Sequence, residues 1–200
     1  ADQYDPSKIM SNSTWCILED DESNLWLASL GIGIDVMNLN TKKIRHYQEG
    51  TDPRGLPHRN IMALYLDSKK RMWIGTEGGG LLRYVKESDS FIKFKNDTAD
   101  NKNISSNDIR TIFEDSEGRL WIGTQAHGLN LFDETSGTFT VFTELDGLVG
   151  NAIYGILEDN ANNLWISTTK GISKFNYTTK KITNYSKLDG LIDADFNYGS

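Results

Sequence analysis

Four tryptophans divide the chain at nearly regular intervals of 47, 48 and 44 residues. Each stands in a near copy of the phrase Leu-Trp-Ile-Gly-Thr, with an aspartate six residues before it and a glycine six or seven residues after it. Because several fixed offsets agree in four copies, the chain must be built from a repeated structural unit. Only Trp15 lies outside the series. The repeated residues are Trp26, Trp73, Trp121 and Trp165, with Asp20, Asp67, Asp115 and Asp159.

Each copy predicts four short antiparallel strands. In the third copy these cover residues 109–114, the tryptophan phrase at 120–124, then 129–132 and 138–142, separated by turn-forming clusters. The tryptophan phrase is continuously apolar, which indicates burial on both faces. Four-stranded sheets covered on both faces and repeated about every 45 residues are typical of β-propeller blades. The sequence therefore predicts an all-β fold.

The blade boundaries follow from the phase of the repeat. We expect blades at approximately residues 13–48, 60–95, 108–143 and 152–186, and the start of a fifth blade at 188–200. The chain enters and leaves the repeat at nearly the same phase, so residues 1–200 are predicted to form a single segment of a larger array, a partial propeller or open arc. Exposed sheet edges at its ends predict self-association.

Composition excludes several classes of site and partner. A net charge of −7 disfavours nucleic acid, and no apolar run approaches the length that crosses a membrane. The single cysteine, Cys16, can form neither an internal disulfide nor a cysteine zinc site. The three histidines never approach metal-ligand spacing, and we expect neither a metal nor a cofactor.

The acidic residues of the repeat do not predict catalysis. Glu-Asp pairs recur at 19/20, 114/115 and 158/159, whereas an enzyme needs its acid and base at one site. The repeated aspartates are expected to cap turns and the repeated tryptophans to fill the core. No catalytic residue is predicted, and the segment is expected to be non-enzymatic.

Positions that differ between copies are the candidates for ligand contact. The loop between the second and third strands and the loop that enters each first strand emerge at the same end of an antiparallel blade. The first of these loops reads Leu30-Gly31-Ile32, Glu77-Gly78-Gly79, Gln125-Ala126-His127 and Thr169-Lys170 in the four copies, and the second offers His58-Arg59-Asn60, Asn107-Asp108 and Asn151. The candidate contact residues are His58, Arg59, Glu77, Gln125, His127 and Lys170.

Residues 11–200 resemble the two-component regulator propeller repeat of hybrid two-component systems in gut Bacteroidetes. The third copy carries the resemblance with Glu114-Asp115, Leu120 to Thr124, Gly128-Leu129 and Asp146-Gly147-Leu148. The resemblance implies part of a periplasmic, carbohydrate-sensing region with two propellers of about seven blades each. It also implies a membrane helix and a cytoplasmic histidine kinase outside this sequence.

Three functions stay open at this point. The resemblance favours a sensor segment that recognises an oligosaccharide or a partner chain and passes a signal to the kinase. A propeller-type lyase or glycosidase would need a unique acid and base, for which His127 near Glu77 is the one suggestion. A protein-interaction scaffold would bind another chain through its rim or edges without a small ligand.

Overall fold

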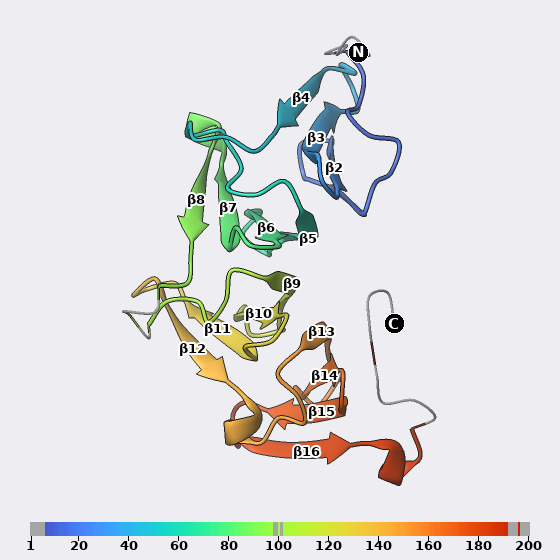
Figure 1. Ribbon diagram of the computed structural model, residues 1–200, viewed down its shortest axis with the longest axis vertical. Coiled ribbons are helices and arrows are strands. Elements are labelled where there is room, and N and C mark those ends of the chain that lie inside the picture. The colour runs from blue at the N-terminus through green and yellow to red at the C-terminus, as the bar shows by residue number, and fades with distance from the viewer. Residues whose placement is uncertain (1–6, 98–99, 101, 192–195, 197–200) are drawn as a thin grey trace. The chain divides into compact units, whose positions relative to one another are not determined.

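Four antiparallel sheets of four strands each make up the fold (Figure 1). The computed structural model describes residues 7–97, 100, 102–191 and 196. The described residues hold sixteen strands and three single-turn 3₁₀ helices, and no α-helix occurs among them. The all-β prediction and the four-stranded sheets are confirmed. The strand expected to open a fifth blade at 188–200 lies mostly outside the described residues.

The strands follow one another in chain order across each sheet. The first two sheets contain β1 (Cys16–Glu19), β2 (Asn24–Ser29), β3 (Gly33–Asn38), β4 (Ile44–Tyr47), β5 (Ile61–Leu66), β6 (Met72–Thr76), β7 (Leu81–Val85) and β8 (Ser90–Phe94). The last two contain β9 (Ile109–Glu114), β10 (Leu120–Thr124), β11 (Leu129–Asp133), β12 (Thr138–Phe142), β13 (Ile153–Glu158), β14 (Leu164–Thr168), β15 (Gly171–Asn176) and β16 (Lys181–Tyr185). The 3₁₀ helices are η1 (Lys86–Ser88), η2 (Glu144–Asp146) and η3 (Lys187–Asp189).

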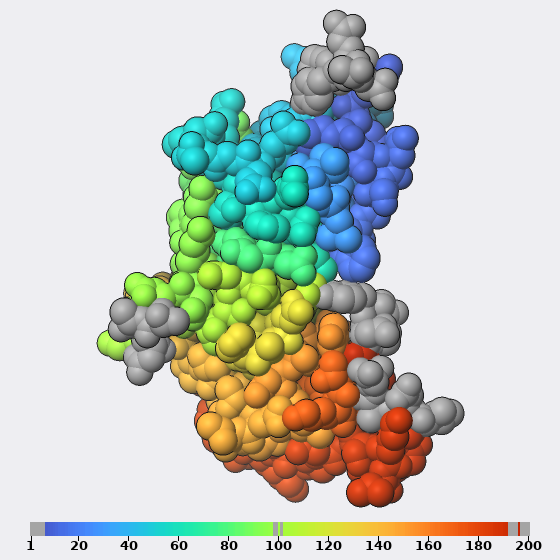
Figure 2. Space-filling view, viewed as in Figure 1, coloured from blue at the N-terminus to red at the C-terminus, as the bar shows by residue number. Residues whose placement is uncertain are grey.

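The chain divides into two compact units, Ala1–Phe94 and Lys95–Ser200, with two sheets in each. In each unit the apolar core lies between the sheets. The core of the first unit joins Trp26, Ile34 and Tyr47 to Ile61 and Ile74. In Figure 2 the blue surface of the first sheet and the cyan-to-green surface of the second meet without a gap. The core of the second unit consists of Trp121, Leu129, Leu148, Ile153, Ile156, Leu164, Ile166 and Phe175.

The glycine of the tryptophan phrase allows close packing between the sheets of the second unit. A Cβ atom at Gly123 would lie 2.6 Å from Thr111 Cγ2 and 2.7 Å from Ile153 Cγ2. Both distances are well below van der Waals contact. Any larger residue here would therefore push β13 away from β10.

One carboxylate organises the turn between the first two strands of every sheet. Each repeated aspartate accepts a hydrogen bond from the indole Nε1 of the tryptophan six residues later, at 2.9, 2.8, 2.7 and 2.9 Å in chain order. The same carboxylate accepts the backbone N–H four residues later, at 2.8–3.0 Å. The turn and the second strand are thereby fixed to each other.

The side chain that pairs with this carboxylate is an arginine in two sheets and an asparagine in the other two. In the second and third sheets Asp67 and Asp115 are buried and pair with Arg71 and Arg119, each with an Nε to Oδ2 distance of 2.6 Å. In the first and fourth sheets an asparagine amide takes the place of the guanidinium. Hydrogen bonds from the backbone of Asn163 and from Trp165 hold the pKa of Asp159 far below its ordinary value.

Replacement of Asp115 by alanine tests this arrangement. The change leaves the indole of Trp121 and two backbone N–H groups without their acceptor, and it removes the buried carboxylate that pairs with Arg119 Nε, although Arg119 keeps its contact with Glu117. Loss of one member of a buried pair costs about 3–5 kcal/mol, so we expect the free energy of unfolding to fall by about 3 kcal/mol or more. Denaturant unfolding followed by circular dichroism measures it.

The matched control is Asp133→Ala, in an exposed turn of the same sheet. Asp133 accepts hydrogen bonds from Thr135 and Ser136 but touches no tryptophan. We expect a much smaller loss for this variant. Equal losses for the two variants would contradict the organising role of Asp115.

Candidate functional site

Loops at one end of each sheet carry the candidate contact residues. We call this end the rim: residues 30–32, 56–60 and 77–80 in the first unit, and 104–108, 125–128, 143–152 and 169–170 in the second. Each rim loop either joins the second and third strands of a sheet or leads into a first strand. The repeated Asp turns lie at the opposite end.

The side chain of Asn60 holds the rim of the first unit together. Its Oδ1 accepts the Gly31 N–H at 2.8 Å, and its Nδ2 donates to Glu77 Oε2 at 2.9 Å. His58 Nδ1 accepts the Asn60 N–H at 3.2 Å, and the His58 ring lies against Gly78. Of the predicted residues, the structure therefore brings His58 and Glu77 together, with the exposed Arg59 between His58 and Asn60 in the chain.

In the second unit two of the predicted side chains already have protein partners. Gln125 accepts a hydrogen bond from Arg110, and Lys170 Nζ donates to the two carboxylate oxygens of Glu144 at 2.9 and 2.8 Å. His127 is exposed, and its backbone carbonyl accepts the Ser105 hydroxyl at 2.9 Å. Gln125 and His127 share one loop, whereas Lys170 lies on the loop of the next sheet.

The candidate acid and base, Glu77 and His127, belong to different units. Neither unit by itself contains that pair. Among the described residues, no group of three or more histidine, cysteine or carboxylate side chains is arranged to hold a metal ion. Within the described part of the chain, no helix is long and apolar enough to cross a membrane.

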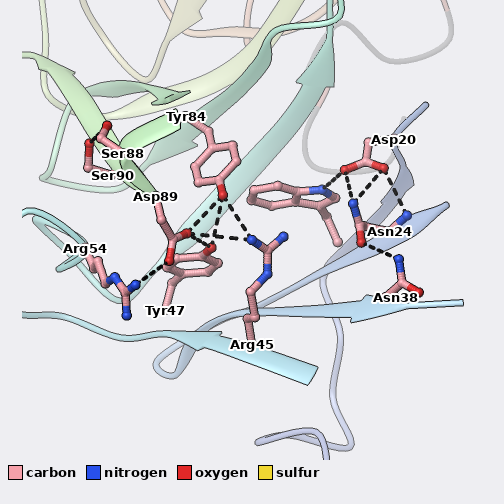
Figure 3. A network of polar contacts seen from close by, with 11 residues as sticks. Asp20, Asn24, Asn38, Arg45, Tyr47, Arg54, Tyr84, Ser88, Asp89 and Ser90 are labelled. Carbon is pink, nitrogen blue, oxygen red and sulfur yellow. Dashed lines mark hydrogen bonds and ion pairs between the residues drawn. The ribbon is translucent and has the colours of Figure 1, made fainter. Parts of the chain in front are cut away.

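A partly buried polar cluster in the first unit was missed by the sequence reasoning (Figure 3). The hydroxyls of Tyr47 and Tyr84 both donate to Asp89 Oδ1, at 2.5 and 2.9 Å. Arg54 reaches Asp89 Oδ2 at 3.0 Å, and Arg45 donates to the Tyr84 hydroxyl at 3.1 Å. The cluster joins the outer strand of the first sheet to the second sheet.

The electrostatics of this cluster favour an ionised aspartate. Burial opposes ionisation of Asp89, but the hydrogen bonds from the two tyrosines and the charges of Arg54 and Arg45 outweigh it and lower the pKa. Burial, followed by the hydrogen bond to Asp89, raises the pKa of Tyr47 well above its ordinary value. Tyr47 therefore stays a neutral donor to a charged acceptor.

The second unit has phenylalanines at the repeat positions of Tyr47 and Tyr84. Phe142 and Phe175 pack on Trp121 with ring centroids 6.0 Å away, as Tyr47 and Tyr84 pack on Trp26 at 6.1 and 5.0 Å. The repeat position would have revealed the exchange of phenylalanine for tyrosine. It could not have revealed Asp89, which reaches the tyrosines only in the folded unit.

A groove of about 350 Å³ lies beside this cluster in the first unit. Its lining mixes charges of both signs: Lys86 pairs with Glu22, and Arg71 pairs with the neighbouring Asp67. In each pair the positive and the negative side chain neutralise each other.

Comparison with known proteins gives one family and several relatives. The model of the family "two component regulator propeller" matches residues 55–78, 103–126 and 147–170. The chain is 33% identical over 197 residues to histidine kinase P4 of Formosa agariphila, which covers 96% of this chain. The chain spans only 14% of that relative's length.

Solved structures show the same arrangement of strands. The extracellular domain of a putative hybrid two component system of Bacteroides thetaiotaomicron is 27% identical, with a TM-score of 0.75, over 86% of this chain and 25% of its own. A second such domain from this organism, 20% identical with a TM-score of 0.64 over 89% of this chain and 31% of its own, shows the fold alone. The chain is thus similar to extracellular sensor domains of hybrid two-component systems.

Replacement of Tyr47 by phenylalanine tests the Asp89 cluster. The variant loses a hydrogen bond to a charged acceptor, so we expect a loss of about 1–2 kcal/mol in the free energy of unfolding at pH 7. Because the folded-state pKa of Asp89 is lowered, its stabilisation is present above the unfolded pKa of about 3.9 and lost as pH falls below it. The difference from the unmodified chain should therefore shrink below about pH 4.

Urea unfolding of both proteins at neutral and acidic pH measures this difference. The control is Tyr185→Phe, at the same repeat position in the fourth sheet, where the ring stacks on Trp165 with centroids 5.5 Å apart. We expect its small effect to be independent of pH. A loss for Tyr47→Phe that is equal at both pH values would contradict the role of ionised Asp89.

Proposed function

Because the chain consists of two-component regulator propeller repeats, we propose that it is a non-enzymatic, periplasmic segment of a hybrid two-component receptor. In this proposal the segment recognises an oligosaccharide and biases a histidine kinase that lies outside these 200 residues. The similarity to extracellular domains of such systems supports the location, and the similarity to a histidine kinase supports the output.

The observation that carries the proposal is the contrast between the two ends of each sheet. At one end the same carboxylate binds the same indole in all four copies. At the rim, loops in equivalent places of the sheets carry side chains that differ from copy to copy. A rigid framework that presents variable loops is how many binding proteins hold their ligand.

The rim also supports binding rather than turnover. The Glu77 carboxylate accepts the Asn60 amide, and the Glu144 carboxylate accepts the Lys170 ammonium. Both carboxylates are oriented by neighbouring donors and have further acceptor sites for a ligand. Such acceptors suit the hydroxyl groups of a sugar.

A triple variant tests the proposal. We expect Glu77→Ala, Gln125→Ala and His127→Ala together to weaken oligosaccharide binding at least about tenfold, because each lost hydrogen bond is worth about 0.5–1.5 kcal/mol. Isothermal titration calorimetry of the whole chain against neutral glucan, mannan and xylan oligosaccharides measures the affinity. Incubation with the same sugars, followed by chromatography, measures turnover.

The control triple variant is Lys43→Ala, Glu87→Ala and Thr135→Ala. These three residues are exposed and lie in turns at the opposite end of their sheets. We expect wild-type affinity for the control and no hydrolysis or elimination product. Release of product would favour an enzyme. Equal affinity of the two triple variants would contradict the assignment of sugar binding to the rim.

We also propose self-association of the sensor segment. Ile17 on the first sheet and Leu157 on the fourth are 61% and 71% exposed, which leaves apolar surface open on each terminal sheet. Apolar surface of this kind favours association. In sedimentation velocity the fraction of dimer should rise with protein concentration. It should be lower for Ile17→Lys and for Leu157→Lys than for the unmodified chain. A monomer at every concentration would contradict this part of the proposal.

A further inference from the structure

The first strands of the sheets contain a β-bulge next to the rim. The pairing register shifts between Ile61 and Ala63, between Ile109 and Thr111, and between Ile153 and Gly155. One residue therefore bulges out of each ladder: Met62, Arg110 and Tyr154. Bulges are frequent beside functional sites because they redirect a side chain.

The bulged residues share one offset in the repeat. Met62, Arg110 and Tyr154 each stand eleven residues before a repeated tryptophan, and Trp15 stands at the same offset in the first copy. Trp15 directly precedes β1, and its N–H donates to the Ala28 carbonyl at 2.7 Å. The tryptophan that lies outside the repeat series thus occupies a regular position of the repeat.

The residue at the bulge position differs between the copies, whereas the residue before it is the same in three of them. It is preceded by isoleucine in three copies, as Ile61, Ile109 and Ile153, all fully buried. The bulge position itself carries tryptophan, methionine, arginine or tyrosine. Met62 and Arg110 are only 8% exposed and Tyr154 is half-buried, so Trp15 is the most exposed side chain at this position of the repeat.

Trp15 has the geometry of a stacking platform. Its indole Nε1 donates to the Met62 carbonyl at 3.1 Å, so the bulge of the second sheet fixes the orientation of the ring. The side chain is 43% exposed, whereas Trp26, Trp73 and Trp121 are at most 1% exposed. An oriented indole with open surface can cover the apolar face of a pyranose ring at little entropic cost.

A polar rim residue, Asn60, lies two positions before Met62, whose carbonyl holds the Trp15 indole. Asn60 in turn binds the Gly31 loop and the Glu77 carboxylate. The first unit thus places hydrogen-bonding groups near an aromatic surface, the combination that a sugar ring needs.

We propose that Trp15 is the sugar-stacking residue of the first unit. The ligand class is a neutral oligosaccharide with an unsubstituted apolar ring face. This inference rests on the proposed function, since it names the contact residue for the same ligand. A protein partner seated on Trp15 is an outcome of the test.

Calorimetry with cellohexaose, laminarihexaose, mannohexaose and xylohexaose tests the platform on the whole chain. We expect Trp15→Ala to weaken binding of the preferred sugar at least about tenfold, in line with about 1.5 kcal/mol for a lost aromatic contact. Trp15→Phe should keep part of the affinity. The control is Ile17→Ala, two residues further along the chain in β1 and 61% exposed, which should bind the sugar as the unmodified chain does.

Fluorescence gives a second readout that does not depend on an alanine variant folding. Trp15 is the most exposed of the five tryptophans, so iodide should quench mainly its emission, and Trp15→Phe should remove the quenchable part. Bound sugar should protect that part. Sugar binding with unchanged quenching and unchanged affinity in Trp15→Ala would overturn this inference and leave the proposed function intact.

Two further outcomes separate the alternatives. No binding of any sugar by the unmodified chain would contradict the proposed function and this inference together. Loss of self-association in Trp15→Ala, with sugar affinity unchanged, would assign the indole to a protein contact instead.

Discussion

The hydrogen bond between an aspartate and the indole six residues later is the interaction on which each sheet depends. The spacing follows from the geometry of an antiparallel turn. In the first sheet Trp26 pairs across the strands with Leu18, two residues before Asp20, so the carboxylate at the strand end lies beside the indole. One side chain then satisfies the turn backbone and the indole N–H, groups that would be costly to bury without partners.

This constraint explains why the repeat of about 45 residues could be recognised from the sequence. The aspartate and tryptophan recur because they bind each other, and the glycine recurs because a side chain does not fit, as at Gly128, where a Cβ atom would lie 2.2 Å from the Phe142 carbonyl oxygen. The four-stranded sheets could therefore be predicted from spacing alone. The rim loops could be placed in the same way, because their position in the sheet follows from strand order.

The contacts that use those loops were beyond sequence reasoning. Asn60 meets Glu77, and Lys170 meets Glu144, through pairings 17 and 26 residues apart that no local pattern encodes. The Tyr47 hydroxyl finds Asp89 at a separation of 42 residues. The bulge beside Met62 is a matter of register between two strands, and a list of residues carries no register. The contacts that could not be predicted are thus those that differ from one copy of the repeat to the next.

Those differences are confined by the framework to a few places. Residues between the sheets are packed too closely to vary without loss, and where they do vary, as Tyr47 for Phe142, a new polar group needs an acceptor such as Asp89. Exposed side chains of the rim loops, such as Arg59 and His127, face no such condition, because they do not pack between the sheets. Each rim loop can therefore change its exposed side chains without disturbing the aspartate–indole turn at the opposite end of the same sheet.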